Sequence, residues 1–75
     1  MDDEIRMKVR VQLLPSGKQT RVVELKKGSD VEELVRTLRL FPDAWIAVRG
    51  ATPLPMDERL EDGDEIKLIA VISGG

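Results

Sequence analysis

The chain has 75 residues, which is enough for one domain with a small core. It contains no cysteine and no histidine, which excludes disulfides, thiolate metal sites, a cysteine nucleophile and a histidine general base. Its net charge of −2 arises from 35% charged residues of interspersed sign, so no basic stripe of the kind that binds nucleic acid directly is present.

No apolar stretch approaches the ~18 residues that a membrane-spanning helix needs. The acidic start, Asp2–Asp3–Glu4, does not suit a signal peptide. We therefore expect a soluble, cytoplasmic protein with no membrane partner, in which residues 1–6 form a flexible acidic extension. The absence of asparagine, combined with the high charge density, is typical of thermophile proteins.

Residues 5–14 alternate strictly between apolar and polar side chains, which predicts a strand with one buried and one charged face. The apolar set is Ile5, Met7, Val9, Val11 and Leu13. Residues 19–26 predict a second strand with Val23 and Leu25 facing inward. The intervening Pro15–Ser16–Gly17–Lys18 has turn chemistry, so the two strands should form an antiparallel hairpin.

The pattern then becomes helical. An i, i+3, i+4, i+7 apolar stripe is formed by Val31, Leu34, Val35 and Leu38. Two caps are open, because Ser29 with Glu32 and Asp30 with Glu33 both have the capping-box spacing. Phe41–Pro42 should end the helix, since the residue before a proline avoids the helical region.

A third strand is predicted over residues 44–49, with Ile46 and Val48 facing inward. Gly50 then turns the chain. Residues 52–55 contain two prolines, each of which removes a ladder donor, so this segment can be at most a short edge strand.

Residues 57–60 should form one helical turn whose Leu60 enters the core, and residues 65–72 predict a last strand. That strand is apolar on both faces, which suits a central position in a sheet. Pairing it beside the first strand gives a mixed sheet of four to five strands with one main helix packed across one face. We therefore predict an α+β fold of the β-grasp type over residues 7–72.

Carboxylates are plentiful, but their pattern does not indicate chemistry. The run Glu61–Asp62–Gly63–Asp64–Glu65 is too short for a calcium loop, whose ligands spread over about twelve positions. A solvated acidic turn explains it better, and capping explains Glu32 and Glu33. We expect no metal site, no cofactor and no catalytic residue of the chain's own.

Two surfaces are candidates for partner docking. One is a basic row on the first strand, which could meet an acidic partner, although a solvated strand face is the favoured interpretation; it consists of Arg6, Lys8 and Arg10. The other follows from the outward face expected for Trp45, the only tryptophan. Exposed apolar patches mark contact sites, and tryptophan is enriched among binding hot spots. The predicted docking residues are Trp45, Ala47, Ile69 and Val71; an equally weighted alternative folds Trp45 back over the helix end near Phe41.

The second half of the sequence carries the most specific motifs. Ile46–Ala47–Val48–Arg49–Gly50 is followed by the turn Leu60–Glu61–Asp62–Gly63–Asp64, an apolar strand and Gly74–Gly75. With these motifs the chain resembles, from Met7 onward, the ThiS/MoaD sulfur carriers and their ubiquitin-like relatives. That family usually has asparagine where Arg49 stands, a departure that falls in a turn.

The resemblance implies that partner enzymes supply the catalytic groups and act on this chain. An ATP-dependent adenylating enzyme of the ThiF or MoeB kind activates the Gly75 carboxylate, which is then converted to a thiocarboxylate. A sulfur-accepting synthase uses the sulfur, such as thiazole synthase in thiamine biosynthesis or the large molybdopterin synthase subunit; tRNA thiolation is a third destination. Residues 73–75 would be a flexible tail in which Ser73 is a small link, and Gly74 lets the chain enter a site where any Cβ would clash.

Two other functions stay open. In the ubiquitin-like relatives the activated carboxylate is joined to a lysine of a target protein, so the chain could be a protein modifier. A β-grasp domain could also be a non-covalent interaction module whose glycine tail is incidental. We expect a monomer when the protein is free.

Overall fold

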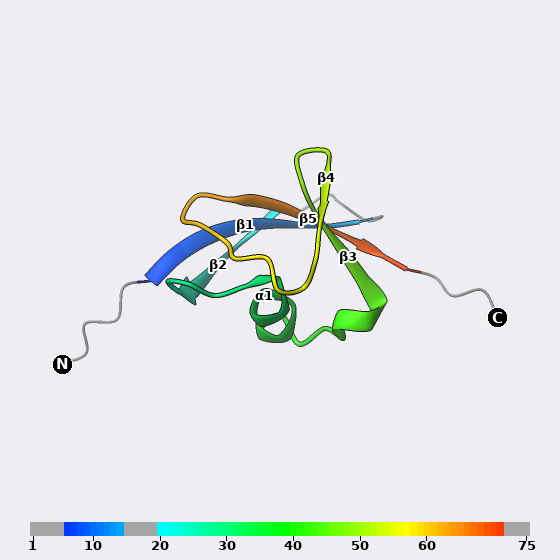
Figure 1. The fold of residues 1–75 in the computed structure, drawn as a ribbon, viewed down its shortest axis with the longest axis horizontal. Coiled ribbons are helices and arrows are strands. Elements are labelled where there is room, and N and C mark those ends of the chain that lie inside the picture. The colour runs from blue at the N-terminus through cyan, green and yellow to red at the C-terminus, as the bar shows by residue number, and fades with distance from the viewer. Residues whose placement is uncertain (1–5, 15–19, 72–75) are drawn as a thin grey trace.

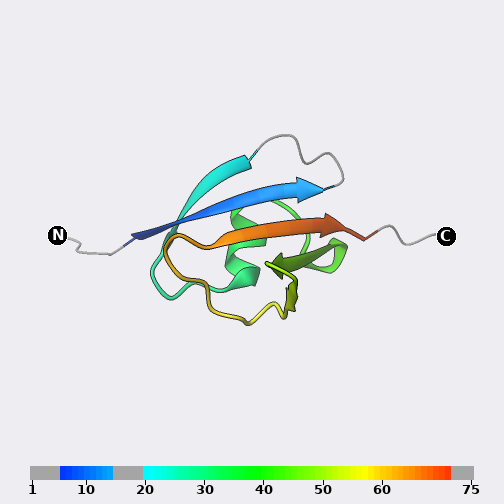
Figure 2. The same ribbon diagram turned by 90° about the horizontal axis from the view of Figure 1, so that it is seen from above.

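The computed structural model describes residues 6–14 and 20–71, which form a five-stranded sheet with one helix packed on one face (Figure 1). Its elements are β1 (Arg6–Leu14), β2 (Thr20–Lys26), α1 (Val31–Thr37), the 3₁₀ helix η1 (Pro42–Ala44), β3 (Trp45–Arg49), β4 (Thr52–Leu54) and β5 (Glu65–Ala70). The strand order is β2-β1-β5-β3-β4, with β1 and β5 parallel and the other neighbours antiparallel (Figure 2). The predicted β-grasp fold is confirmed.

The core lies between α1 and the inner face of the sheet. Its buried side chains are Met7, Val9, Val11, Val23, Leu25, Val31, Leu34, Val35, Ala47, Leu60, Ile66 and Leu68. The inward faces predicted for β1 and β2 are therefore confirmed within the described residues, and Leu13 packs partly against the same cluster. β5 is the central strand, as its apolar character on both faces indicates. The predicted turn at residues 15–18 lies outside the described residues.

Tertiary partners hold the start of α1. Asp30, one of the two predicted caps, accepts the N–H of Glu33 on its Oδ1 at 2.9 Å. The N–H groups of Val31 and Glu32 donate to main-chain carbonyls within residues 56–58, at 3.0 and 2.9 Å. The first N–H groups of a helix have no partner inside it, so this segment supplies acceptors that the helix lacks.

The same contacts explain why residues 57–60 do not form the predicted helical turn. The carbonyl of Glu58 accepts a hydrogen bond from α1, and Arg59 forms an isolated bridge with Asp30. Leu60 donates its N–H to the carbonyl of Ser29 at 2.9 Å. The chain turns at residues 56–57, where Glu58 donates its N–H to the carbonyl of Pro55 at 3.1 Å. Residues 58–60 then run beside the helix start, and Leu60 enters the core as predicted.

The prediction that Phe41–Pro42 ends the helix is wrong, because α1 already ends at Thr37. Arg39 adopts a left-handed conformation with φ 63°. Its N–H donates to the carbonyl of Arg36, and the N–H of Leu40 donates to Val35, at 2.9 and 3.0 Å. This pair of bonds is the Schellman motif, which usually has glycine at the left-handed position, so the sequence gives no signal for it.

The inward face of β3 is the reverse of the prediction. Ile46 is 45% exposed, whereas Ala47 is fully buried. The register places Ala47 beside buried Leu68 and Ile46 beside exposed Ile69, and paired residues share a face of the sheet. Because this strand is apolar on both faces, its own sequence does not determine which face is inward; pairing with β5 does.

At the start of β1, Arg6 belongs to the sheet and not to the flexible extension, because it pairs with Lys26 of β2. Residues 1–5 lie outside the described residues, so the rest of that prediction stays a prediction.

Arg49 ties β3 to the acidic turn before β5. Its guanidinium donates to Asp64 Oδ2 at 2.8 Å and to the carbonyl of Arg59 at 3.2 Å, and it lies 3.6 Å from Glu58 Oε2. The same Asp64 oxygen accepts the N–H of Glu61 at 2.9 Å. The residue that departs from the family pattern therefore acts beyond its own turn, by holding residues 58–64.

Replacing Arg39 with glycine should raise the free energy of unfolding by about 0.5–1 kcal/mol. A left-handed conformation destabilises a non-glycine residue by about 1–2 kcal/mol, and glycine removes this strain. Glycine also loses more backbone entropy on folding, which offsets about 0.5–1 kcal/mol of the gain. Denaturant unfolding of Arg39→Gly measures the change. An unchanged or lower midpoint would show that the left-handed turn carries no strain.

The reversed face of β3 gives a matched pair of variants. Ala47→Leu should lower stability by about 1–3 kcal/mol, because extra methylenes enter a closed core. Ile46→Thr, which keeps the β-branched shape at an exposed position, should stay within about 0.5 kcal/mol of the wild type. Urea unfolding of both proteins checks this, and equal losses would contradict the observed orientation.

Candidate docking surface and tail root

The acidic turn before β5, residues 61–64, is hydrogen-bonded to β1. Asp62 Oδ1 accepts the N–H of Lys8 at 2.8 Å, and the Gly63 N–H donates to the carbonyl of Lys8 at 2.8 Å. Gly63 has φ +87°, which favours glycine in this turn. The turn therefore attaches residues 61–64 to β1.

Among the described residues, no three carboxylate, histidine or cysteine side chains gather as a metal ion would require. None of their helices is long and apolar enough to cross a membrane.

An apolar patch occupies the outer face of the sheet, opposite α1. Ile69 of β5 is flanked by Leu14 of β1 and Ile46 of β3 in the strand register. Ile69 and Val71 are 38% and 44% exposed. We call the five outward apolar residues at this end of the sheet the sheet-face patch: Leu14, Ile46, Val48, Ile69 and Val71. Outward apolar side chains that adjoin one another in this way make this face a candidate contact surface.

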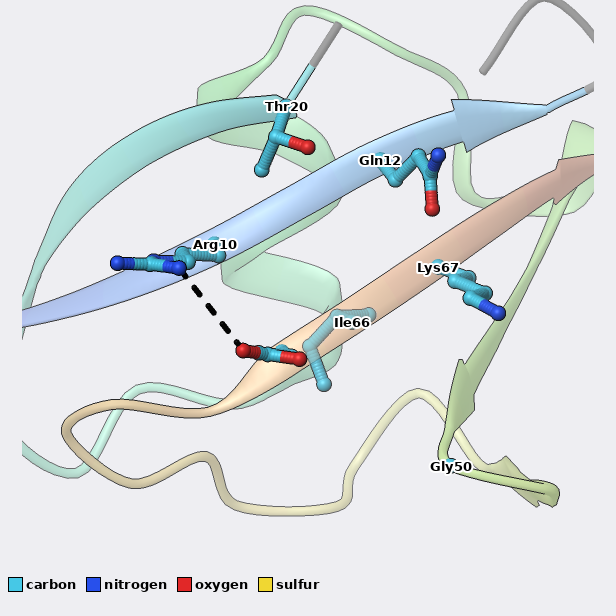
Figure 3. Close-up of a pocket in the computed structure, with 7 residues that line it drawn as sticks. Arg10, Gln12, Thr20, Gly50, Ile66 and Lys67 are labelled. Atoms are coloured by element: carbon cyan, nitrogen blue, oxygen red, sulfur yellow. Dashed lines mark ion pairs between the residues drawn. The ribbon is translucent and has the colours of Figure 1, made fainter. Parts of the chain in front are cut away.

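A polar hollow lies beside the sheet-face patch, because its lining residue Lys67 pairs in register with Val48. It has a volume of about 350 Å³ and is lined by Arg10, Gln12, Thr20, Gly50, Glu65, Ile66 and Lys67 (Figure 3). Arg10 forms an ion pair with Glu65 at 4.0 Å. The exposed basic row of β1 continues from Arg10 away from the patch, so the apolar surface has a cationic border on that side.

The predicted docking residues divide between the two faces. Ile69 and Val71 lie in the sheet-face patch, but Ala47 is fully buried, so it cannot touch a partner while the fold is intact. Trp45 is half-buried and packs against the core. Sequence reasoning missed Ile46 because it assumed the wrong inward face for β3. The sequence did contain a signal for Ile46: Ile69 is apolar on the outer face of the central strand, so the residue that pairs with it on β3 should also be apolar.

The root of the tail is held by η1. Val71, which follows β5, donates its N–H to the carbonyl of Ala44 at 2.9 Å. Ala44 in turn donates to the carbonyl of Phe41 at 2.9 Å. The chain therefore leaves the sheet at a defined place, beside the junction of η1 and β3. Ser73, Gly74 and Gly75 lie outside the described residues.

Comparison with known proteins identifies relatives of matching length. No family model matches the chain. It is 32% identical over 62 residues to the sulfur carrier protein TtuB of Thermus thermophilus, covering 83% of this chain and 91% of that protein. It is 29% identical over 69 residues to an uncharacterised protein of Archaeoglobus fulgidus, covering 92% and 100%.

Solved structures agree on the fold. The ubiquitin of Caldiarchaeum subterraneum superposes with a TM-score of 0.71 at 21% identity, covering 95% of this chain and all of that one. A ubiquitin-like domain of the 4931431F19Rik protein superposes with a TM-score of 0.74 at 14% identity, covering 100% and 84%. The identity to a sulfur carrier along most of both chains, together with the ubiquitin-like sheet and helix, shows that the chain belongs to the ubiquitin-like sulfur carrier proteins of the ThiS/MoaD kind.

Proposed function

We propose that the chain carries sulfur as a thiocarboxylate on Gly75. The observation that supports this most is the identity to a sulfur carrier over 91% of that protein's length. The absence of histidine and cysteine agrees with a protein that is acted upon by an enzyme.

The proposed chemistry takes place on the carboxylate. A carboxylate oxygen attacks the α-phosphorus of ATP in a partner enzyme, and pyrophosphate leaves. The resulting acyl adenylate has AMP as a good leaving group, which a sulfur nucleophile of the partner system displaces at the acyl carbon. The sulfur then passes to a synthase, in thiamine thiazole or molybdopterin biosynthesis or in tRNA thiolation.

The fold supports this role by separating docking from reaction. The sheet-face patch offers apolar area on the same sheet that ends at the tail root, so a partner can bind the domain while its active site holds the tail. We propose that the adenylating enzyme docks on this patch, mainly through Ile46, Ile69 and Val71. Trp45 supports the patch from the inner face, where it packs against the core.

Intact mass spectrometry tests the carrier proposal. Incubation with the cognate adenylating enzyme, ATP and a sulfur source should give a mass shift that corresponds to one oxygen replaced by sulfur. The reaction should not occur when ATP is omitted, or in a variant that lacks Gly74–Gly75. An unchanged mass with an enzyme that is active on another substrate would rule out the carrier function.

Two further experiments distinguish the alternatives. Higher-mass conjugates that form in a cell lysate and disappear when Gly75 is deleted would identify a protein modifier. A variant without Gly74–Gly75 that retains the full function of the protein in cells would identify a non-covalent interaction module.

A charge placed in the sheet-face patch tests the docking surface. Ile69→Glu should raise the KM for the carrier roughly tenfold or more, because an uncompensated carboxylate would be buried at the interface. Val22→Glu is a matched control, since Val22 is 59% exposed on the outermost strand β2. Steady-state adenylation kinetics measure both. If the two variants behave alike, the patch is not the docking surface.

A further inference from the structure

The side chain of Phe41 is exposed to solvent and is not part of the core. It is 78% exposed, more than Val22, Ile46, Ile69 or Val71, the other exposed large apolar residues in the described part of the chain. It is one of only two aromatic residues in the chain. Large aromatic side chains contribute most to stability when they are buried, so this position gives the folded domain little.

The backbone holds Phe41 beside the tail root. Phe41 is the N-cap of η1, and its carbonyl accepts the N–H of Ala44, whose own carbonyl accepts the N–H of Val71. Two consecutive hydrogen bonds thus connect this residue to the last described residue of the chain. On the other side, the Schellman bonds of Arg39 and Leu40 fix the entry to the same loop.

The backbone conformation of Arg39 is unfavourable for a residue with a side chain. Its φ of 63° is in the region that favours glycine. Its side chain is exposed, and no ion pair or side-chain hydrogen bond joins it to another described residue. A strained position whose side chain makes no ion pair or hydrogen bond with the described residues is a candidate for a contact with a partner.

The reach of the tail defines what that contact is. Gly75 is four residues beyond Val71, and four residues span at most about 14 Å when fully extended. An enzyme whose reacting atoms meet Gly75 must therefore approach the tail root to within that distance. η1 contacts α1 and lies on the helix side of the sheet (Figure 1). The residues of the sheet-face patch point to the opposite face. The two surfaces therefore lie on either side of the tail root at Val71.

We infer that Arg39 and Phe41 form a second anchor for the enzyme that acts on the Gly75 carboxylate. The Phe41 ring enters an apolar pocket at the mouth of that enzyme's tail channel, and the Arg39 guanidinium pairs with a carboxylate on the rim. Aromatic residues and arginine are the side chains that carry most binding energy at interfaces. This anchor rests on the proposed function, and it would hold the domain from the helix side while the sheet-face patch holds it from the other.

Adenylation kinetics with the cognate enzyme, followed as ATP–pyrophosphate exchange, test the anchor. Phe41→Ala should raise the KM for the carrier roughly tenfold, with kcat nearly unchanged, because the contact positions the domain and does not touch the reacting atoms. Phe41→Leu should restore part of the affinity. Val22→Ala, an exposed apolar residue on the far edge of the sheet, is the control and should match the wild type.

Arg39→Gly separates binding from folding. Its unfolding midpoint should rise while its KM also rises several-fold, and Arg39→Lys should retain most of the affinity, because it keeps the charge. Val22→Ala sets the reference KM. If Phe41→Ala or Arg39→Gly has the same KM as this control, the assignment of that residue to the anchor is overturned. If the wild-type chain itself supports no exchange, the proposed function fails, which the wild-type reaction shows without reference to the variants.

Discussion

The start of α1 is the constraint on which the rest of the structure depends. A helix of seven residues is too short to be stable alone, so it forms only if its unpaired N–H groups and its apolar stripe find partners elsewhere. The carbonyls of Met56 and Glu58 meet the first need, and the inner face of the sheet meets the second. This requirement draws residues 56–60 across the helix start and places Leu60 in the core.

The same arrangement makes β5 a rigid base for the tail. It lies between β1 and β3, its inner residues Ile66 and Leu68 are buried, and the acidic turn before it is attached to β1 and to Arg49. Val71 is held by η1 immediately after the strand ends. The thiocarboxylate that we propose on Gly75 would be presented most precisely if the chain leaves the domain from such a fixed point.

Charge and apolar surface are distributed unevenly over the two faces. The outer face of β1 is basic and adjoins the sheet-face patch, while many carboxylates lie on α1 and in residues 57–65. Several of those carboxylates satisfy backbone N–H groups or Arg49. Acidic residues therefore shape the fold around the helix start and before β5, while the basic row of β1 lies on the outer face beside Glu24 and Glu65.

The sequence by itself determined the elements whose pattern has one physical solution. The strict alternation of β1 could bury only Met7, Val9 and Val11, and the two-faced apolar run of β5 required a central strand. Residues 46–50, 60–64 and 74–75 carry the resemblance to the sulfur carrier family in their order along the chain alone. These signals are local or read directly from residue order, so they need no knowledge of packing.

Tertiary structure decided what local pattern leaves open. Ile46 and Ala47 are both apolar, so only pairing with β5 determined which is buried, and the proposed docking surface therefore includes Ile46 in place of Ala47. The early end of α1 depends on a left-handed arginine, a conformation that composition does not signal. The place of Phe41 beside the tail root exists only because Val71 and Ala44, far apart in sequence, share a hydrogen bond.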